Sequence, residues 1–167
     1  MLEIVKYPDP VLRLRAEEVD IVDDEIREFL SEMTETMYIA DGAGLAAPQV
    51  GVSKRIVVLD AGDGLVPLIN PVITVPENVN RVTSDEGCLS LPDIRVDVTR
   101  PEKIHVDALN ENGEPISFDA DGLLARVVQH ETDHLNGVMI IDHVSTIQRQ
   151  LIKPKLRKLE KVYSKAV

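Results

Sequence analysis

The residues best suited to chemistry are the run His130-Glu131-Thr132-Asp133-His134. Side chains four positions apart lie above one another on an α-helix, so His130 and His134 can contact one metal ion. Glu131 follows the first histidine, where it can accept a proton from water at such an ion. A pattern this short also arises by chance, so the surrounding sequence decides its meaning.

The preceding residues indicate that this motif lies on an amphipathic helix. Leu123 and Val127 fall on the same helical face as His130 and His134. We expect this face to point into the protein, where two imidazoles without partners would be costly. A metal site is therefore the favoured interpretation of the motif.

Other segments must hold this helix in place. The spacing of Ile26, Leu30, Met33 and Met37 predicts a helix from Asp23 to about Ala40. Short segments rich in β-branched residues and bounded by glycine, proline and asparagine then predict strands. These segments are residues 55–60, 65–69, 94–98, 103–109 and 116–119.

A last helix is predicted from about Thr146 to Lys161, and Pro154 either kinks it or begins a second segment. Its expected apolar stripe is Ile147, Leu151, Leu156, Leu159 and Tyr163. The order of elements predicts an α+β fold, with antiparallel or mixed sheets packed around the helix of the two histidines. One helix lies N-terminal and one C-terminal to this core. The length predicts a single catalytic domain over residues 1–167.

The composition is that of an ordinary globular protein, with 44% hydrophobic and 28% charged residues. No run of residues is long and apolar enough to span a membrane, and the N-terminus lacks a signal pattern. We therefore expect a cytoplasmic protein without membrane contact. The single cysteine, Cys88, excludes an intramolecular disulfide and is a core residue, a nucleophile or a ligand.

Charge is distributed unevenly along the chain. The net charge of −11 argues against a general nucleic-acid binder. Residues 146–167 hold seven basic residues and one acidic residue, Glu160, so that this segment carries +6 and the remainder carries −17. The basic residues are Arg149, Lys153, Lys155, Arg157, Lys158, Lys161 and Lys165. Such a split predicts that the C-terminal helix contacts an acidic surface.

A catalytic metal site usually has a third protein ligand. In one zinc-protease pattern a third histidine stands ten positions after the first, where this chain has Ile140, and His143 comes three positions too late. In another pattern the ligand is a downstream glutamate, but Glu160 stands among lysines typical of a solvated surface. Cys88 remains, because a thiolate suits a borderline metal, although a free cysteine is often an inert core residue.

A further candidate segment, residues 42–49, combines two glycines with Gln49. It follows a predicted helix and precedes a strand, so it is not a dinucleotide fingerprint, and its glycines could simply end the helix. The Gln49 amide could donate a hydrogen bond to a developing oxyanion or could lie on the surface.

Together the three segments resemble the signature motifs of the peptide deformylase family. Residues 42–49, 86–90 and 129–134 match, in order, a Gly-x-Gly-Leu-Ala-Ala-x-Gln stretch, a Glu-Gly-Cys-Leu-Ser stretch and a Gln-His-Glu-x-x-His stretch. The resemblance extends over nearly the whole chain. It implies a metal-dependent hydrolase that removes the N-formyl group from formyl-methionine at the start of nascent polypeptides and releases formate.

By this resemblance, Cys88, His130 and His134 are expected to bind one divalent metal per chain, with water at the fourth position. The resemblance implies Fe(II) in the cell, and Zn(II), Ni(II) or Co(II) are the alternatives. The sequence departs from the family at Ala43, where a branched aliphatic residue is more common.

The resemblance also assigns roles within the reaction. Glu131 is expected to carry the proton, while Gln49 and the backbone N–H of Leu89 are expected to stabilise the oxyanion. The expected substrate-binding residues are Ala43, Gly44, Gly87, Leu123 and Val127. Basic residues of the C-terminal helix are expected to contact the ribosome, although the helix could instead simply pack against the body of the protein.

Two questions stay open at this level. Glu86 and Arg100 either form an ion pair that braces the cysteine segment or are separate solvated charges, and Asp133 either orients a ligand or is solvated. His105 and His143 are interpreted as structural. The alternative functions are a zinc endoprotease, which lacks a downstream ligand here, and a ribosome-associated binding module with a structural metal.

Overall fold

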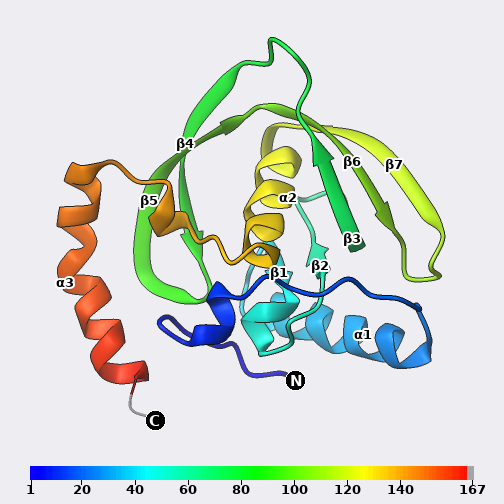
Figure 1. Cartoon of the computed structure of the whole chain (residues 1–167), viewed down its shortest axis with the longest axis horizontal. Coiled ribbons are helices and arrows are strands. Elements are labelled where there is room, and N and C mark those ends of the chain that lie inside the picture. The colour runs from blue at the N-terminus through cyan, green and yellow to red at the C-terminus, as the bar shows by residue number, and fades with distance from the viewer. Residues whose placement is uncertain (165–167) are drawn as a thin grey trace.

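The computed structural model describes residues 1–164 and places one helix at the centre of two β-sheets (Figure 1). The central helix is α2 (Gly122–Leu135); α1 (Asp24–Ile39) lies beneath the larger sheet, and α3 (Thr146–Tyr163) lies beside the smaller one. Three short 3-10 turns complete the helical structure, at Pro10–Arg13, Ala47–Val50 and Ile140–Asp142. The predicted α+β class is confirmed.

Both sheets are antiparallel. The larger sheet has the order β1-β2-β3-β6-β7, and the smaller one is the β4-β5 hairpin. The strands are β1 (Gly44–Ala46), β2 (Ile56–Leu59), β3 (Val66–Thr74), β4 (Arg81–Cys88), β5 (Leu91–Pro101), β6 (Lys103–Leu109) and β7 (Pro115–Asp121). Helix α2 packs between the two sheets (Figure 1).

Five of the seven strands correspond to predicted segments, and two were missed. Strand β3 runs beyond the predicted residue 69 because an irregularity between Ile69 and Val72 shifts its register with β6 without ending the pairing. Strand β1 is too short to show alternation. Strand β4 is exposed from Arg81 to Asp85, so it has no buried apolar face, and pairing with β5 defines it instead.

Helix α1 follows the predicted pattern closely. The side chain of Asp23 caps it by accepting a hydrogen bond from the backbone N–H of Ile26 at 3.0 Å. The predicted apolar residues are all buried and pack against β1 and β2. This packing holds β1 in place at the edge of the larger sheet. Residues 42–49, which include β1, contact α2 from that edge.

Helix α2 buries one face against the larger sheet through Ala125, Val128 and Leu135. The prediction that Leu123 shares a buried face with the histidines is wrong, because Leu123 is 58% exposed near the start of the helix. Burial on that face begins one turn later, at Val127. The first turn of α2 therefore borders solvent while its second half is enclosed.

Helix α3 runs without interruption through Pro154, so no second segment begins there. The predicted apolar stripe is wrong at three of its five positions: Ile147 and Leu151 are 73% and 72% exposed, and Tyr163 is 41% exposed. Ile152, Leu156 and Leu159 instead pack with β5 and with the turn at Ile140–Asp142. Lys165 of the basic segment lies outside the described residues. Across residues 1–164, no helix combines the length and apolar character needed to cross a bilayer.

Candidate active site

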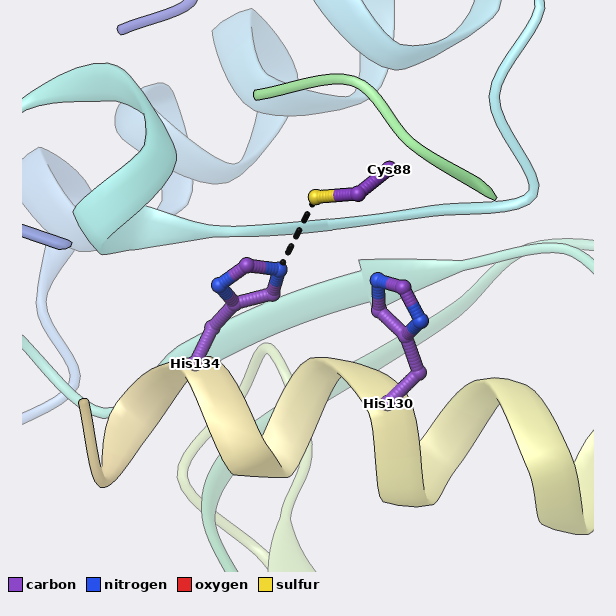
Figure 2. Close-up of side chains that lie close together, drawn as sticks. All are labelled: Cys88, His130 and His134. Atoms are coloured by element: carbon purple, nitrogen blue, oxygen red, sulfur yellow. Dashed lines mark hydrogen bonds between the residues drawn. The ribbon is translucent and has the colours of Figure 1, made fainter. Parts of the chain in front are cut away.

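The sulfur of Cys88 lies next to the imidazoles of the two α2 histidines (Figure 2). One potential ligand atom from each of Cys88, His130 and His134 lies within 4.8 Å of the others. The Cys88 Sγ and His134 Nε2 atoms are 3.3 Å apart, and the two imidazole centroids are 5.2 Å apart. The predicted convergence of these three residues is therefore present in the geometry.

Cys88 reaches this point because the β4-β5 hairpin changes register at its closed end. Gly87 pairs with Arg95, whereas Cys88 pairs with Leu91. A Cβ atom at Gly87 would lie 2.6 Å from Nη1 of Arg95, so glycine leaves room for that side chain. The irregularity turns the thiol inward, toward α2.

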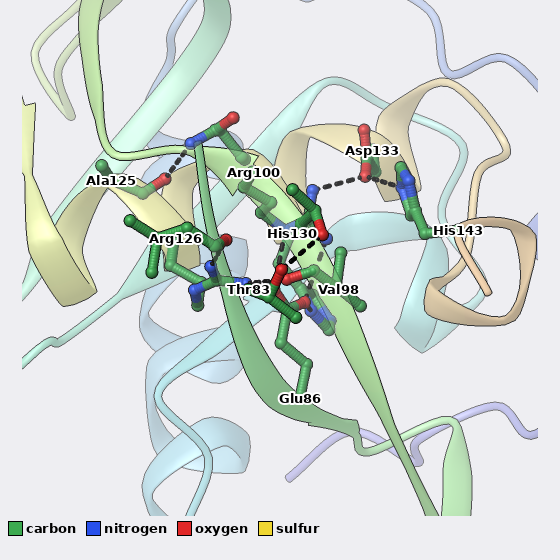
Figure 3. Close-up of polar contacts among 12 residues, drawn as sticks. Thr83, Glu86, Val98, Arg100, Ala125, Arg126, His130, Asp133 and His143 are labelled. Atoms are coloured by element: carbon green, nitrogen blue, oxygen red, sulfur yellow. Dashed lines mark hydrogen bonds and ion pairs between the residues drawn. The ribbon is translucent and has the colours of Figure 1, made fainter. Parts of the chain in front are cut away.

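Glu86 holds the first histidine from behind, with its Oε1 2.9 Å from His130 Nδ1 (Figure 3). Arg100 donates two hydrogen bonds to the Glu86 carboxylate, at 2.7 and 3.0 Å, and Arg126 donates a third. Glu86 and Arg100 are both buried, so the ion-pair alternative is the correct one. Burial alone would raise the pKa of Glu86, but hydrogen bonds from His130 and Arg100 hold it well below its usual range.

Asp133 contacts Arg100 and not a candidate ligand. Its Oδ2 accepts hydrogen bonds from Arg100 Nη1 at 2.9 Å and pairs with His143 Nε2 at 2.9 Å (Figure 3). Arg100 therefore spans two carboxylates and connects β5 to α2. His143 contacts Asp133, and His105 lies on the exposed side of β6 with its Nδ1 2.7 Å from Asp119 Oδ1. Neither histidine belongs to the cluster of potential ligand atoms found among the described residues.

Glu131 is enclosed beside the three residues, with only 3% of its surface exposed. Its Oε1 has no hydrogen-bond partner among residues 1–164. A Cβ atom at residue 44 would lie 2.6 Å from Glu131 Oε2, so Gly44 is required for this close approach. Burial raises the pKa of Glu131 to about 7, which poises the carboxyl between its two protonation states at neutral pH.

The donor set fits a metal ion. Burial lowers the pKa of His134 well below its usual value, so this imidazole is neutral, as a ligand must be. Burial also lowers the pKa of His130, but the negative charge of Glu131 and the contact with Cys88 outweigh this effect and raise it. The surroundings of His130 therefore stabilise a positive charge at this position. His134 Nδ1 also has no partner within the described chain. One thiolate with two imidazoles is a ligand set for Zn(II), Fe(II) and related ions.

Gln49 is buried beside the cysteine and does not lie on the surface. Its Oε1 accepts a hydrogen bond from the backbone N–H of Ala46 at 3.0 Å. Its Nε2 donates to Ser90 Oγ at 3.2 Å and lies 3.6 Å from Cys88 Sγ. The turn at Ala47–Val50 thus directs the amide N–H groups toward the thiol.

An open cleft of about 550 Å³ leads to these residues. All the expected substrate-binding residues line it, namely Ala43, Gly44, Gly87, Leu123 and Val127, and so do Gln49 and Leu89. Arg126 also lines the cleft and was missed. It stands four residues before His130, on the same helical face, and this spacing was the available signal.

A buried glutamate beside a Cys-His₂ set, at the end of a cleft between antiparallel sheets, defines the class of metal-dependent hydrolases. Comparison with known proteins narrows this class. The family described as polypeptide deformylase matches residues 1–150. The peptide deformylase of Thermodesulfovibrio yellowstonii is 45% identical over 162 residues, which cover 94% of this chain and 97% of the relative.

Solved structures agree. The crystal structure of peptide deformylase from Thermotoga maritima has a TM-score of 0.84 at 47% identity, covering 87% of this chain and 98% of that one. A Plasmodium falciparum peptide deformylase structure has a TM-score of 0.92 at 38% identity, covering 98% of both chains. The chain belongs to the peptide deformylase family. It is a hydrolase that removes the N-formyl group from nascent polypeptides.

Proposed function

We propose that Cys88, His130 and His134 are the ligands of one divalent metal in a single catalytic domain, residues 1–167. The observation that carries this proposal is the approach of their ligand atoms to within 4.8 Å. We propose Fe(II) as the metal in the cell and Zn(II), Ni(II) or Co(II) as ions that also fit the ligand set. When bound, a divalent metal polarises a carbonyl oxygen and lowers the pKa of water to about 7.

Glu131 is the proton carrier in this proposal. Its pKa of about 7 lets it accept a proton from the attacking water and return that proton to the leaving amine. Its unpartnered Oε1 leaves an acceptor free for this purpose within the described residues. The products are formate and a free α-amine.

Gln49 and the backbone N–H of Leu89 stabilise the oxyanion that develops on the formyl oxygen. Gln49 Nε2 is preorganised because its own carbonyl is fixed by Ala46 and its N–H by Ser90. Leu89 follows Cys88 directly and lines the cleft. Both donors therefore stand beside the thiol, where the formyl group would be held.

The peptide substrate binds along the edge of the larger sheet. Strand β1 is the first strand of that sheet and, within residues 1–164, pairs only with β2, so its other edge has no strand partner there and can take an added strand along Ala43 and Gly44. Gly87 borders the opposite side of the cleft. Leu123 and Val127 form the apolar wall for the methionine side chain, with Leu123 at the mouth and Val127 deeper.

Replacing Gln49 with leucine tests the oxyanion role. Loss of one such donor is expected to lower kcat by about 10²–10³ while the metal content stays unchanged. Formate release from formyl-Met-Ala-Ser and metal analysis of oxygen-free preparations measure the two quantities. The matched control is Gln148→Leu on α3, outside the cleft, and it should keep full turnover. Normal kcat in Gln49→Leu would remove the amide from the mechanism.

We further propose that α3 docks the enzyme on ribosomes in the cytoplasm. Its exposed side carries Ile147 and Leu151, and its lysines and arginines give the C-terminal segment a charge opposite to the rest of the chain. Ile152, Leu156 and Leu159 pack the helix onto the body, and Arg149 and Lys155 donate hydrogen bonds to the backbone carbonyls of Ile141 at 2.9 Å and Asp93 at 3.0 Å. The other basic side chains of the helix make no hydrogen bond or ion pair among residues 1–164, namely Lys153, Arg157, Lys158 and Lys161. Ribosomal RNA is a polyanion that these charges would bind.

Reversing the charges of Lys155, Arg157, Lys158 and Lys161 to glutamate is expected to abolish ribosome co-sedimentation. Phosphate contacts weaken steeply with salt, so wild-type binding should also fall between about 50 and 200 mM salt. Hydrolysis of a free formyl-tripeptide should stay nearly unchanged, because these residues lie outside the cleft. Undiminished co-sedimentation of the variant at low salt would leave α3 as a structural helix only.

A further inference from the structure

A second cavity, of about 500 Å³, lies behind the metal-site helix. Gln129 and Thr132 of α2 line it together with Asn136, which directly follows the helix, whereas His130 and Glu131 line the catalytic cleft. Strands β3, β4 and β5 and the N-terminal segment complete its walls. The substrate path described above does not pass through it.

The charge of this cavity is opposite to that of the protein. Its lining includes four arginines, Arg15, Arg55, Arg81 and Arg100, but one carboxylate, Asp133. The whole chain has a net charge of −11. Asp133 is already paired with Arg100 and His143 (Figure 3). Within residues 1–164, the other three arginines have no carboxylate within 4.0 Å. The cavity therefore carries more positive than negative charge, and its one carboxylate is already engaged by Arg100 and His143.

Two of these guanidinium groups converge on a single neutral oxygen. Arg55 is only 8% exposed, and its Nη2 donates to Asn136 Oδ1 at 3.1 Å. Arg15 Nη1 donates to the same oxygen at 3.2 Å. Arg55 Nη1 also donates to the backbone carbonyl of Leu135 at 3.0 Å. Burial and, next, the charge of Arg15 lower the pKa of Arg55, and the negative charge of Glu18 offsets this lowering only in part.

A buried hydroxyl completes the arrangement. Thr132 lines the cavity and is 8% exposed, and its Oγ1 has no hydrogen-bond partner within the described chain. A buried hydroxyl without a partner is costly, so an acceptor in the cavity would satisfy it. The same acceptor would offset the charges of Arg15 and Arg55.

We propose that this cavity binds a phosphate-type oxyanion, held by the guanidinium groups of Arg15 and Arg55 and the hydroxyl of Thr132. Guanidinium groups donate paired hydrogen bonds that match the oxygens of phosphate, and charge-assisted hydrogen bonds of this kind are strong. The ligand is either free phosphate or the phosphate group of a small monoester. Such a site is separate from deformylation and adds an anion ligand to this enzyme.

Titration calorimetry of the metal-loaded enzyme with inorganic phosphate at constant ionic strength tests the proposal. We expect saturable binding of one phosphate per chain, weakened about tenfold or more in Arg15→Gln and in Thr132→Val, because each change removes a hydrogen bond to a charged ligand. The exposed position of Arg15 and the similar shape of valine should preserve folding. The matched control Arg157→Gln removes one positive charge from α3 and should bind like wild type.

Phosphate held at the metal ligands would be insensitive to Arg15 and Thr132. Phosphate affinity in Arg15→Gln and Thr132→Val equal to that of wild type would therefore overturn the proposal. So would the absence of saturable binding in wild type. Repeating the titration with glycerol phosphate separates the two sources of ligand. Binding at least as tight as that of phosphate indicates the headgroup of a larger molecule, whereas binding of phosphate alone indicates the free ion.

Discussion

Replacing Cys88 with alanine is expected to remove the bound metal and formyl hydrolysis together. The thiol supplies one of three converging ligands, and two imidazoles on one helix hold a divalent ion far less tightly than a set of three. Deformylase activity should fall to the level of the metal-free protein. Metal content after oxygen-free preparation and formate release from a formyl-tripeptide give the two readouts.

The matched control for this change is Ser90→Ala, because Ser90 is buried in the same segment and bonds Gln49 but is not a proposed ligand. That variant should keep one metal per chain. If Cys88→Ala binds one metal as tightly as wild type, the ligand assignment is wrong. A fall in activity with full metal content would instead place Cys88 among the residues that act on substrate.

Replacing Glu131 with glutamine is expected to preserve metal binding and lower kcat by about 10²–10⁴, the range typical for loss of a general acid–base. Glutamine fills the same space against Gly44, so the cleft should keep its shape. Metal content and single-turnover formate release distinguish this outcome from a structural effect. A metal-free variant would make Glu131 a ligand, and near-normal turnover would exclude it as proton carrier.

The same variant has a pH signature in the metal-free protein. Burial raises the pKa of Glu131 from 4.5 to about 7, so the folded state holds a proton that the unfolded state releases as pH rises. Wild type should therefore lose stability relative to Glu131→Gln between pH 4.5 and about 7, by roughly 3 kcal/mol, and no further above that. Urea unfolding across this range measures the difference. A difference that is constant with pH would contradict the burial argument.

The sequence allowed the local features to be predicted well. Helix α1 and the pair His130 and His134 were predictable because helical periodicity depends only on residues a few positions apart. Periodicity identifies a face but not what covers it. For that reason the predictions that Leu123, Ile147 and Leu151 are buried were wrong. Whether a helical face is covered depends on elements that lie elsewhere in the chain.

Features built by chain pairing were not predictable. Glu86 and Arg100 meet because the β4-β5 hairpin brings their strands together, with Glu86 opposite Val96, and no local pattern encodes that register. Strand β4 was missed for the same reason, because its side chains are mostly exposed. The convergence of Arg15 and Arg55 on Asn136 combines three distant segments and required the structure.

The separation of the candidate ligands along the chain has a mechanical consequence. The histidines share one helix, but Cys88 lies 46 residues before His134, at the end of the largely exposed strand β4. An ion bound to all three would act as a cross-link that closes this long loop. By analogy with a disulfide closing a loop of similar length, the loss of unfolded-chain entropy is worth between roughly 3 and 5 kcal/mol. The end of β4 around Cys88 should therefore loosen first when the ion leaves, while β5 stays held by its buried apolar residues and α2 stays packed between its sheets.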